Sequence, residues 1–130
     1  MGLYNFKKQF APFILEGSKT HTIRAMRAHP EKPGNMLHLY TGLRQKGATL
    51  LFRAPCVKVE EIEIEEIAEI LQVPVHVVRV DGESLDRGEC EALARRDGFR
   101  DFTEMMKFWD GRLPFKGHII HWNYSARQLS

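Results

Sequence analysis

The stretch from Gly17 to Arg24 constrains the fold of this chain most, because a helix must stop there and a strand must begin. Three apolar residues at helical spacing precede it: Phe10, Phe13 and Ile14. Gly17 then occupies the position of a C-terminal glycine, which ends a helix. Three β-branched residues follow and favour a strand: Thr20, Thr22 and Ile23. The sequence therefore predicts a short helix, a tight turn and an early strand.

Alternation along this strand divides its side chains between two faces. Thr20, Thr22 and Arg24 share one face, and His21 and Ile23 share the other. A face with two hydroxyls and a guanidinium suits an anionic or hydrogen-bonding ligand. A solvated strand with Ile23 in the core explains the same pattern, so the residues alone leave both interpretations open.

The remaining patterns predict an α+β fold. They indicate about five to six strands, at residues 3–6, 20–24, 36–40, 48–59, 75–80 and 117–124. Helices are expected over residues 90–98 and after Asp101, and a helical turn is expected over residues 67–71. Long strands with a bulge at Pro55 close most easily into a small mixed β-barrel with peripheral helices. The length suits a single domain, residues 1–130.

Composition excludes several classes of protein. No apolar run approaches the ~20 residues that a membrane helix needs, and the first ten residues lack the apolar core of a signal peptide. We therefore expect no membrane partner and a cytoplasmic location. Cys56 and Cys90 share no metal-binding or redox motif, which favours two reduced cysteines in the core.

Charge is distributed unevenly along the chain. Residues 1–58 carry ten Lys/Arg and two Asp/Glu, whereas residues 59–130 carry nine Lys/Arg and fifteen Asp/Glu. A basic half favours a polyanion or nucleotide partner, although charges that segregate along a sequence need not share a surface. Six glutamates lie within residues 60–69. A solvated outer face explains them, and binding to a basic partner is the alternative.

Four short motifs occur in a fixed order along nearly the whole chain. They are residues 17–24, Pro33-Gly34 ahead of residues 37–42, Asp97-Gly98-Phe99 ahead of a capped helix, and residues 115–122. With these motifs in this order the chain resembles the ASCH domain family, within the PUA-like superfamily. The resemblance implies a small β-barrel surrounded by helices, with a basic cleft beside the Gly-Ser-Lys-Thr segment, and a role in RNA metabolism.

One branch of that family consists of acetylcytidine amidohydrolases, which use a lysine, a threonine and a glutamate. Lys19 and Thr22 match the first two. The family usually has Glu-Gly-Phe where this chain has Asp97-Gly98-Phe99, and aspartate is one methylene shorter than glutamate. The resemblance therefore implies a catalytic set of Lys19, Thr22 and Asp97 with a shorter acid.

The chemistry of these residue types fits a hydrolase. A threonine hydroxyl becomes nucleophilic when a base removes its proton, and a lysine serves as that base when its environment favours the neutral amine. Thr22 would then be the nucleophile, Lys19 its base and Asp97 the supporting acid of an amidohydrolase that acts on an acylated nucleoside.

Binding without catalysis is the leading interpretation, with RNA or a modified nucleotide or nucleoside as the ligand. A ribonuclease that uses the same basic cleft is a third. Cations and aromatic rings are the side chains that bind single-stranded RNA. Seven residues are candidates for contact with the ligand or RNA: Thr20, Arg24, Arg27, Tyr40, Arg44, Lys46 and Arg53.

The sequence predicts neither a metal nor a cofactor. No pair among the six histidines has the spacing of a zinc motif. The segment Gly17–Thr20 ends like a phosphate-binding loop, but Pro12 stands where the upstream glycine would be, and a strand is expected to follow it instead of a helix. We therefore reject a nucleotide-triphosphate loop.

Overall fold

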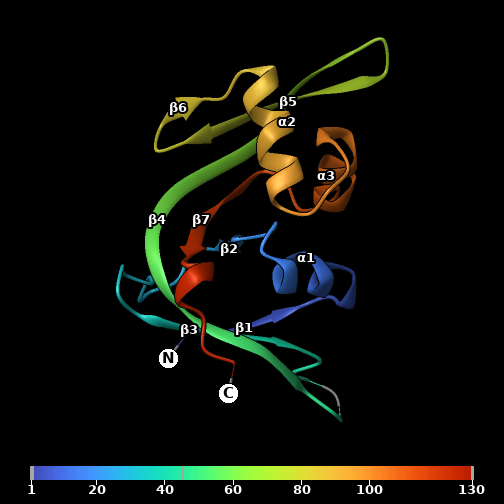
Figure 1. Ribbon diagram of the computed structural model, residues 1–130. Helices are drawn as coiled ribbons and strands as arrows, with labels where there is room; N and C mark the ends of the chain where they lie inside the picture. Colours follow the sequence, from blue (N-terminus) through green and yellow to red (C-terminus); the bar gives the residue numbers. More distant parts are fainter. Residues whose placement is uncertain (1, 45, 130) are drawn as a thin grey trace. The chain divides into compact units, whose positions relative to one another are not determined.

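The computed structural model describes residues 2–44 and 46–129 and is a small mixed α+β protein (Figure 1). Its elements follow one another as β1 (Gly2–Phe6), η1 (Lys8–Phe10), α1 (Ala11–Glu16), β2 (His21–Ala25), β3 (Met36–Thr41), β4 (Thr49–Ile70), β5 (Val73–Val80), β6 (Glu83–Ser84), α2 (Arg87–Arg96), α3 (Phe102–Trp109), β7 (Phe115–Trp122) and η2 (Tyr124–Ala126). The helices α1, α2 and α3 are α-helices, and η1 and η2 are 3₁₀ turns.

The strands form an open sheet with the order β1-β3-β4-β5-β6, and β7 pairs with both β2 and β4. This arrangement confirms the α+β prediction and gives seven strands, one more than the upper expectation. The sheet is not closed, so the small barrel predicted from the sequence is not confirmed. By its internal contacts the chain divides into two compact units. Unit 1 is Met1–Thr22, Pro30–Val59 and Ile120–Ser130, and unit 2 is Ile23–His29 and Glu60–Ile119.

Unit 1 is built on three neighbouring strands. β1 runs parallel to β3, and β3 runs antiparallel to the first part of β4. Alternate side chains of these strands form its core, as the period of two requires: Tyr4, Phe6, Leu37, Leu39, Phe52 and Ala54. Ile14 of α1 joins them, because helical spacing places it on the buried side of that helix.

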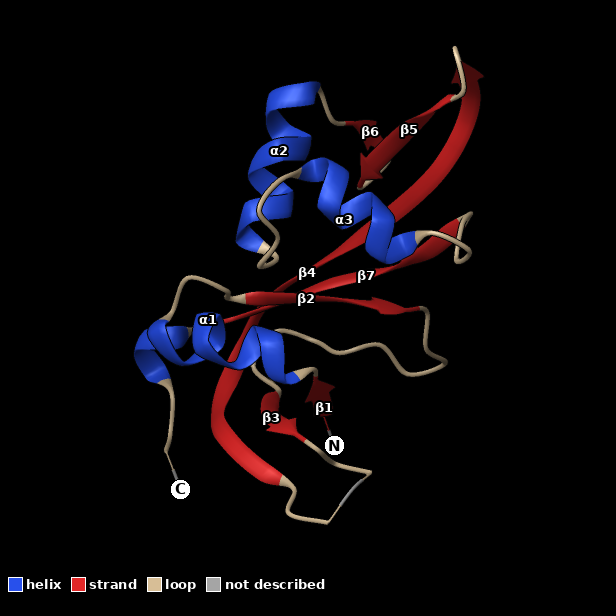
Figure 2. Cartoon of the chain, turned by 90° about the vertical axis from the view of Figure 1, so that its right-hand side faces the viewer, coloured by secondary structure: helices blue, strands red, loops and turns tan. Residues whose placement is uncertain are grey.

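Unit 2 contains a long β-hairpin and two helices. The second part of β4 pairs antiparallel with β5, and the two-residue turn Leu71–Gln72 joins them. α2 and α3 lie side by side (Figure 2). Both begin at an aspartate whose carboxylate accepts a hydrogen bond from the backbone N–H three residues later, in the pairs Asp86–Glu89 and Asp101–Glu104. The second pair confirms the capping pattern predicted from the sequence.

One local prediction was wrong. Residues 67–71 form no helical turn, because β4 continues to Ile70 and the chain then reverses into β5. Ile67 sits at a bulge, where the pairing shifts between Glu66 and Ala68. This extra residue interrupts the alternation of apolar and polar side chains and imitates the spacing of a helix.

Candidate functional site

The turn after α1 fixes the path of the chain into the predicted site. Gly17 has a φ of 88°, in the left-handed region that ends helices. Its N–H donates to the carbonyl of Ile14 at 3.3 Å, and the N–H of Lys19 donates to the carbonyl of Phe13 at 3.0 Å. A Cβ atom at Gly17 would lie 2.7 to 2.9 Å from ring carbons of Tyr124. Glycine is therefore required there twice, by the backbone angle and by the aromatic ring.

The ring of Tyr124 is itself held in place. Its hydroxyl donates to the carbonyl of Leu15 at 2.6 Å, and the guanidinium of Arg127 lies 4.0 Å from its centroid. The C-terminal segment of unit 1 thus closes over the end of α1. This packing orders the residues immediately before Lys19.

Lys19 is buried, with 3 % of its surface exposed. Its ammonium lies 5.1 Å from the centroid of the Phe10 ring, within the range of a cation–π interaction. Thr22, on β2, is buried as well. The structure therefore places the predicted nucleophile and the predicted base in unit 1, both in the protein interior.

Burial is rare for charged groups in this protein. The chain has 19 Lys/Arg and 17 Asp/Glu, all within the described residues, and two of them are buried: Lys19 and Asp97. Three further polar side chains are buried in the described part of the chain: His21, Thr22 and Thr41. Lys and Asp are almost never fully buried unless they are paired, so Lys19 and Asp97 differ from the other charged residues of this chain.

Asp97 belongs to unit 2 and follows the last residue of α2. Its N–H donates to the carbonyl of Leu93 at 2.9 Å, and Gly98 after it has a φ of 98°. A carboxylate at the C-terminal end of a helix faces the negative end of the helix dipole, which is unfavourable for it. Helix capping therefore does not explain why an acid is buried at this position.

Sequence reasoning left out one neighbour of Thr22. The ring of His21 is buried and lies 5.4 Å, centroid to centroid, from the ring of His121 on β7. The sequence placed His21 on the opposite face of a regular strand, but both faces of β2 are buried at this point. The pairing of β2 with β7 brings the two histidines together, and no local signal in the sequence predicts that pairing.

The predicted contact residues fall into two groups. Arg24 and Arg27 belong to unit 2, whereas Thr20, Tyr40, Arg44, Lys46 and Arg53 belong to unit 1. Within unit 1, Arg53 lies directly opposite His38 in the β3–β4 register, and Tyr40 is two residues further along β3. These three side chains are half-buried on the face of β3 that points away from Leu37 and Leu39.

The loop between β3 and β4 adds positive charge at one end of this face. Arg44 and Lys46 are both exposed in it. The backbone N–H of Leu43 donates to the side-chain carbonyl of Asn5 at 2.9 Å, which anchors the start of the loop. The structure therefore brings together, in one unit, an aromatic ring and three of the predicted cations.

Two hollows were not predicted from the sequence. One has a volume of about 720 Å³ and the other of about 360 Å³, and both are lined by residues of unit 2. None of the predicted site residues lines either of them. A helical turn was expected over residues 67–71, so the β4–β5 hairpin whose strands form part of their walls was not predicted.

Among the described residues, no cluster of three or more His, Cys, Asp or Glu side chains is arranged to hold a metal ion. Cys56 and Cys90 are free and buried, as predicted. Within the part of the chain that the structure describes, no helix has both the length and the apolar character needed to cross a bilayer. Comparisons of this chain with protein-family models, with curated proteins and with solved structures found no match.

Proposed function

We propose that this protein binds single-stranded RNA, or a nucleotide derived from it, through unit 1. The observation that carries the proposal is the face formed by His38, Tyr40 and Arg53, with Arg44 and Lys46 in the adjoining loop. Aromatic rings stack on bases and cations neutralise phosphates, and this face offers both within one unit. Unit 1 carries nine Lys/Arg and two Asp/Glu, so its net charge of +7 favours a polyanion.

The fold and location that belong to this proposal come from the sequence. In this proposal the protein is a PUA-like RNA-binding domain, as its resemblance to the ASCH family implies. The two free cysteines fit a reducing compartment such as the cytoplasm.

Binding of a fluorescein-labelled single-stranded RNA, followed by anisotropy over a range of salt concentrations, tests the proposal. Each phosphate contact on a single strand contributes about 0.7 to the slope of log K against log salt. The double variant Arg44→Gln/Lys46→Gln should therefore lower that slope by about 1.4. The matched control is Lys7→Gln/Lys8→Gln, which removes two exposed positive charges of the same unit, between the end of β1 and the start of η1.

Tyr40→Leu supplies the second arm of this experiment. Loss of base stacking should weaken binding by about 1 kcal/mol or more, at least roughly fivefold in Kd, with the salt slope unchanged. Equal effects of the loop variant and the control variant would show that binding follows net charge alone. That result, or no binding by the native protein, would overturn the proposal.

A second candidate function, hydrolysis of an acylated nucleoside, is supported by the burial of Lys19 and Thr22. Burying a lysine destabilises a protein, so a buried lysine three residues before a buried threonine favours a chemical role. In this reaction the hydroxyl of Thr22 gives its proton to Lys19 and attacks the acyl carbonyl, the C–N bond breaks, and the nucleoside amine leaves with a proton. Water then hydrolyses the acyl-enzyme and releases the carboxylic acid.

Release of acetate from acetylcytidine tests this candidate. Thr22→Val and Lys19→Met keep the shape of each side chain and remove its reactive group. Each should abolish acetate release while the RNA affinity of the face around Tyr40 is kept. Asp97 belongs to the other unit, and its predicted role as supporting acid is tested by Asp97→Asn in the same assay.

The labelled RNA serves as a second substrate in that assay, so that cleavage by the ribonuclease interpretation is also detected. A native protein that binds the labelled RNA but neither cleaves it nor releases acetate acts by binding alone. Activity that survives both Lys19→Met and Thr22→Val would show that other residues carry the reaction.

A further inference from the structure

The hairpin of β4 and β5 in unit 2 has two unlike faces. Ile64 opposite Val78 belongs to the inner face, and both are buried. The ring of His76 lies on the same face and packs edge to face against the ring of Phe102 of α3, with the two ring centroids 6.4 Å apart. The helices therefore cover this face. The other face carries apolar side chains that face solvent near the tip of the hairpin: Ala68, Ile70 and Val73.

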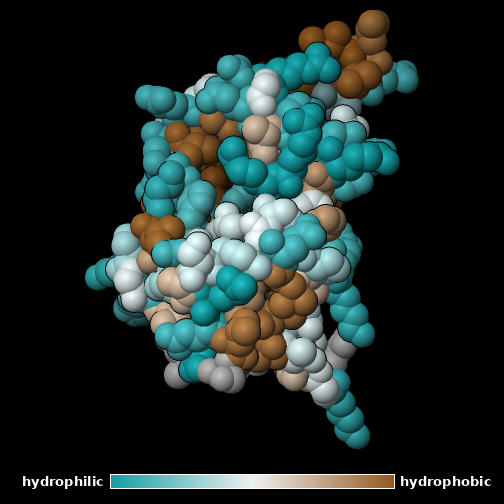
Figure 3. All heavy atoms as spheres, viewed as in Figure 1, coloured by the Kyte–Doolittle hydropathy of each residue, from teal (hydrophilic) through white to brown (hydrophobic). Residues whose placement is uncertain are grey.

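Apolar exposure is strongest at the tip itself. Four large apolar residues of the hairpin are more than half exposed: Ile67, Ile70, Leu71 and Val73. The space-filling view shows a hydrophobic group at the upper right, with hydrophilic residues beside it (Figure 3). Patches of this kind at one end of a soluble protein mark sites of interaction with other molecules.

The outer edge of β5 is open over most of its length. β5 pairs with β4 on one side, and on the other side β6 reaches only Arg79 and Val80. The N–H of Leu85 donates to the carbonyl of Val78 at 2.8 Å, so the main-chain groups of Val78 face this edge. By alternation, those of His76 and Pro74 face it too.

This edge therefore presents three main-chain groups to an incoming strand: the N–H and C=O of His76 and the C=O of Pro74. Within the described residues these groups have no backbone partner. Proline is confined to edge strands because it has no N–H to donate, and Pro74 fits that position. An open edge of this kind is a template for β-strand addition.

A hollow runs along the same edge. The volume of about 720 Å³ is bounded by residues 73–76 of β5, by Leu85 and α2, and by α3. Its apolar lining includes Cys90, Phe102 and Met106, which suits apolar side chains of a bound segment. A segment that continued the line of β6 along β5 would enter this hollow.

The second hollow, of about 360 Å³, shares Glu66, His76 and Asp110 with the first. Its lining has three carboxylates, from Glu65, Glu66 and Asp110, and no Lys or Arg. Arg79 pairs with Glu65, whereas Glu66 has only the ring of His76 at 3.9 Å, and Asp110 has no ion pair within the described part of the chain. The smaller hollow is therefore suited to a cationic side chain.

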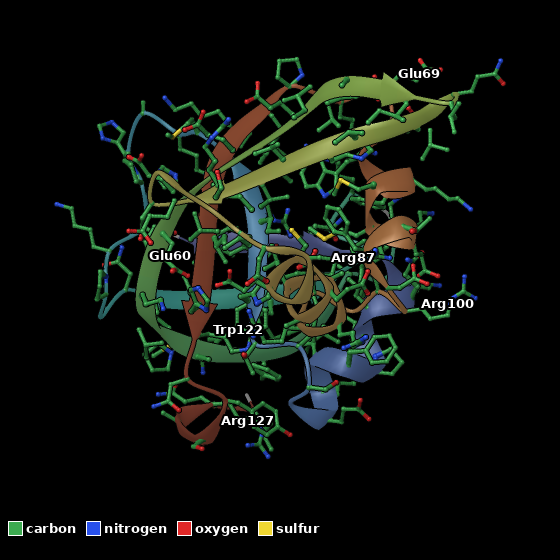
Figure 4. All side chains as sticks on the ribbon, turned by 90° about the horizontal axis from the view of Figure 1, so that it is seen from above. Glu60, Glu69, Arg87, Arg100, Trp122 and Arg127 are labelled. Atoms are coloured by element: carbon green, nitrogen blue, oxygen red, sulfur yellow. The ribbon has the colours of Figure 1, made fainter. Side chains whose placement is uncertain are left out.

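The hairpin as a whole strengthens this preference for positive charge. Residues 60–83 hold eight Asp/Glu and one Arg, a net charge of −7. Glu60 and Glu69 mark the two ends of the run of glutamates along β4, with Glu69 close to the tip (Figure 4). Arg87, Glu91 and Lys107 line the larger hollow from α2 and α3, so its helix side carries charges of both signs.

We propose that the open edge of β5 binds an extended polypeptide segment of a partner protein, in which one face of the strand carries both apolar side chains and a basic one. The segment adds as a strand beside Pro74 and His76. Its apolar side chains enter the larger hollow, and a basic side chain meets Glu66 and Asp110 in the smaller one. This function uses unit 2 and is separate from the RNA binding proposed for unit 1.

Fluorescence anisotropy tests the proposal with a labelled seven-residue peptide that has valine at positions 1, 3 and 5, arginine at position 7 and threonine at the positions between them, so that the valines and the arginine share one face. The same peptide with N-methylated valines keeps the charge and removes N–H donors, and an analogue with glutamate in place of arginine reverses the charge. We expect the first peptide to bind and both others to bind at least about tenfold more weakly, the change that 1.4 kcal/mol produces.

Two pairs of variants test the contacts on the protein. His76→Pro removes the side chain and the outward N–H, whereas His76→Ala removes the side chain and keeps the N–H, so a larger loss with proline isolates the main-chain bond. Glu66→Gln/Asp110→Asn should weaken binding about tenfold or more. The control Glu61→Gln/Glu83→Gln removes two negative charges of the same hairpin outside the hollows and should have little effect.

Equal binding of the N-methylated peptide, or equal effects of the two charge variants, would show a non-specific ionic attraction and overturn the proposal. Absence of binding to the first peptide would overturn it as well. Sedimentation of the protein alone tests whether a second copy of this chain binds the edge of β5 instead. A native dimer that His76→Pro converts to a monomer would assign this edge to a second copy of the chain and refute a separate basic partner.

Discussion

Replacing Gly17 by alanine tests how the segment before Lys19 is held. The substitution has two effects that the structure separates. Alanine must adopt a φ of 88°, and its Cβ must displace the Tyr124 ring, whose carbons lie 2.7 to 2.9 Å from that position. Gly34 is the matched control, because its φ is 96° and a Cβ there meets no atom within 4 Å.

The magnitude follows from these two effects. A non-glycine residue in the left-handed region costs about 1–2 kcal/mol, which applies to both variants. Displacing Tyr124 also loses its hydrogen bond to Leu15, about 0.5–1.5 kcal/mol, and the stacking of Arg127, about 0.5–1 kcal/mol. Gly17→Ala should therefore lower the free energy of unfolding by about 1–2.5 kcal/mol more than Gly34→Ala does.

Urea denaturation followed by circular dichroism measures this difference, provided that the m-value is unchanged. A double-mutant cycle with Tyr124→Ala then isolates the clash, because the extra cost of Gly17→Ala should disappear when the ring is absent. Equal destabilisation by Gly17→Ala and Gly34→Ala would refute the reasoning. So would an extra cost that persists in the Tyr124→Ala background.

Three further predictions concern unit 2 and the cysteines. Asp86→Ala removes the capping box of α2 and should lower the free energy of unfolding by about 1 kcal/mol, measured in urea; no change would contradict the role of the cap. Leu71→Asn with Gln72→Gly should raise it by about 1 kcal/mol or more, because both turn residues have positive φ (52° and 64°) and Asn-Gly is favoured in such turns; a loss of thermal stability would argue against this turn. Burial raises the pKa of the Cys56 and Cys90 thiols, so Ellman's reagent should react slowly with the native protein and rapidly in urea. The unfolded thiols ionise first as the pH rises above about 8.5, so these two groups lower the stability of the fold there, and Cys90→Ala should reduce that part of the pH dependence.

The sequence predicted those parts of the fold that local chemistry determines. The glycine stop at Gly17 and the cap at Asp101 were predicted correctly, because each depends on residues within one turn of the chain. The free, buried cysteines also agreed with expectation. The hairpin tip was mispredicted, since the bulge at Ile67 gives β4 the apolar spacing of a helix.

Long-range pairing accounts for most of the rest. The contact of His21 with His121 depends on the pairing of β2 with β7. These two histidines are about a hundred residues apart in the chain. Burial of Lys19 was not predicted either, since an exposed or half-exposed lysine is the ordinary outcome for this residue type. The open edge of β5 depends on the length of β6, and no residue pattern shows that β6 ends after two residues.

The uneven charge of the sequence has a structural counterpart. Unit 1 has a net charge of +7 and unit 2 a net charge of −5, and β4 carries basic residues in its first part and glutamates in its second. The two proposed ligands therefore differ in sign of charge, RNA for unit 1 and a basic peptide for unit 2.

Added salt weakens the binding of both ligands by screening, so it does not separate them. Competition with heparin does separate them. Heparin binds unit 1 and displaces RNA from it, whereas it lowers peptide binding by binding the free peptide and not unit 2. In this assay heparin is first mixed with the protein, which is then titrated into a fixed concentration of each labelled ligand. The apparent Kd for RNA should rise as more heparin is bound. A heparin footprint by hydrogen exchange that falls on β5 instead of on β3 and its loop would contradict this assignment of charge to function.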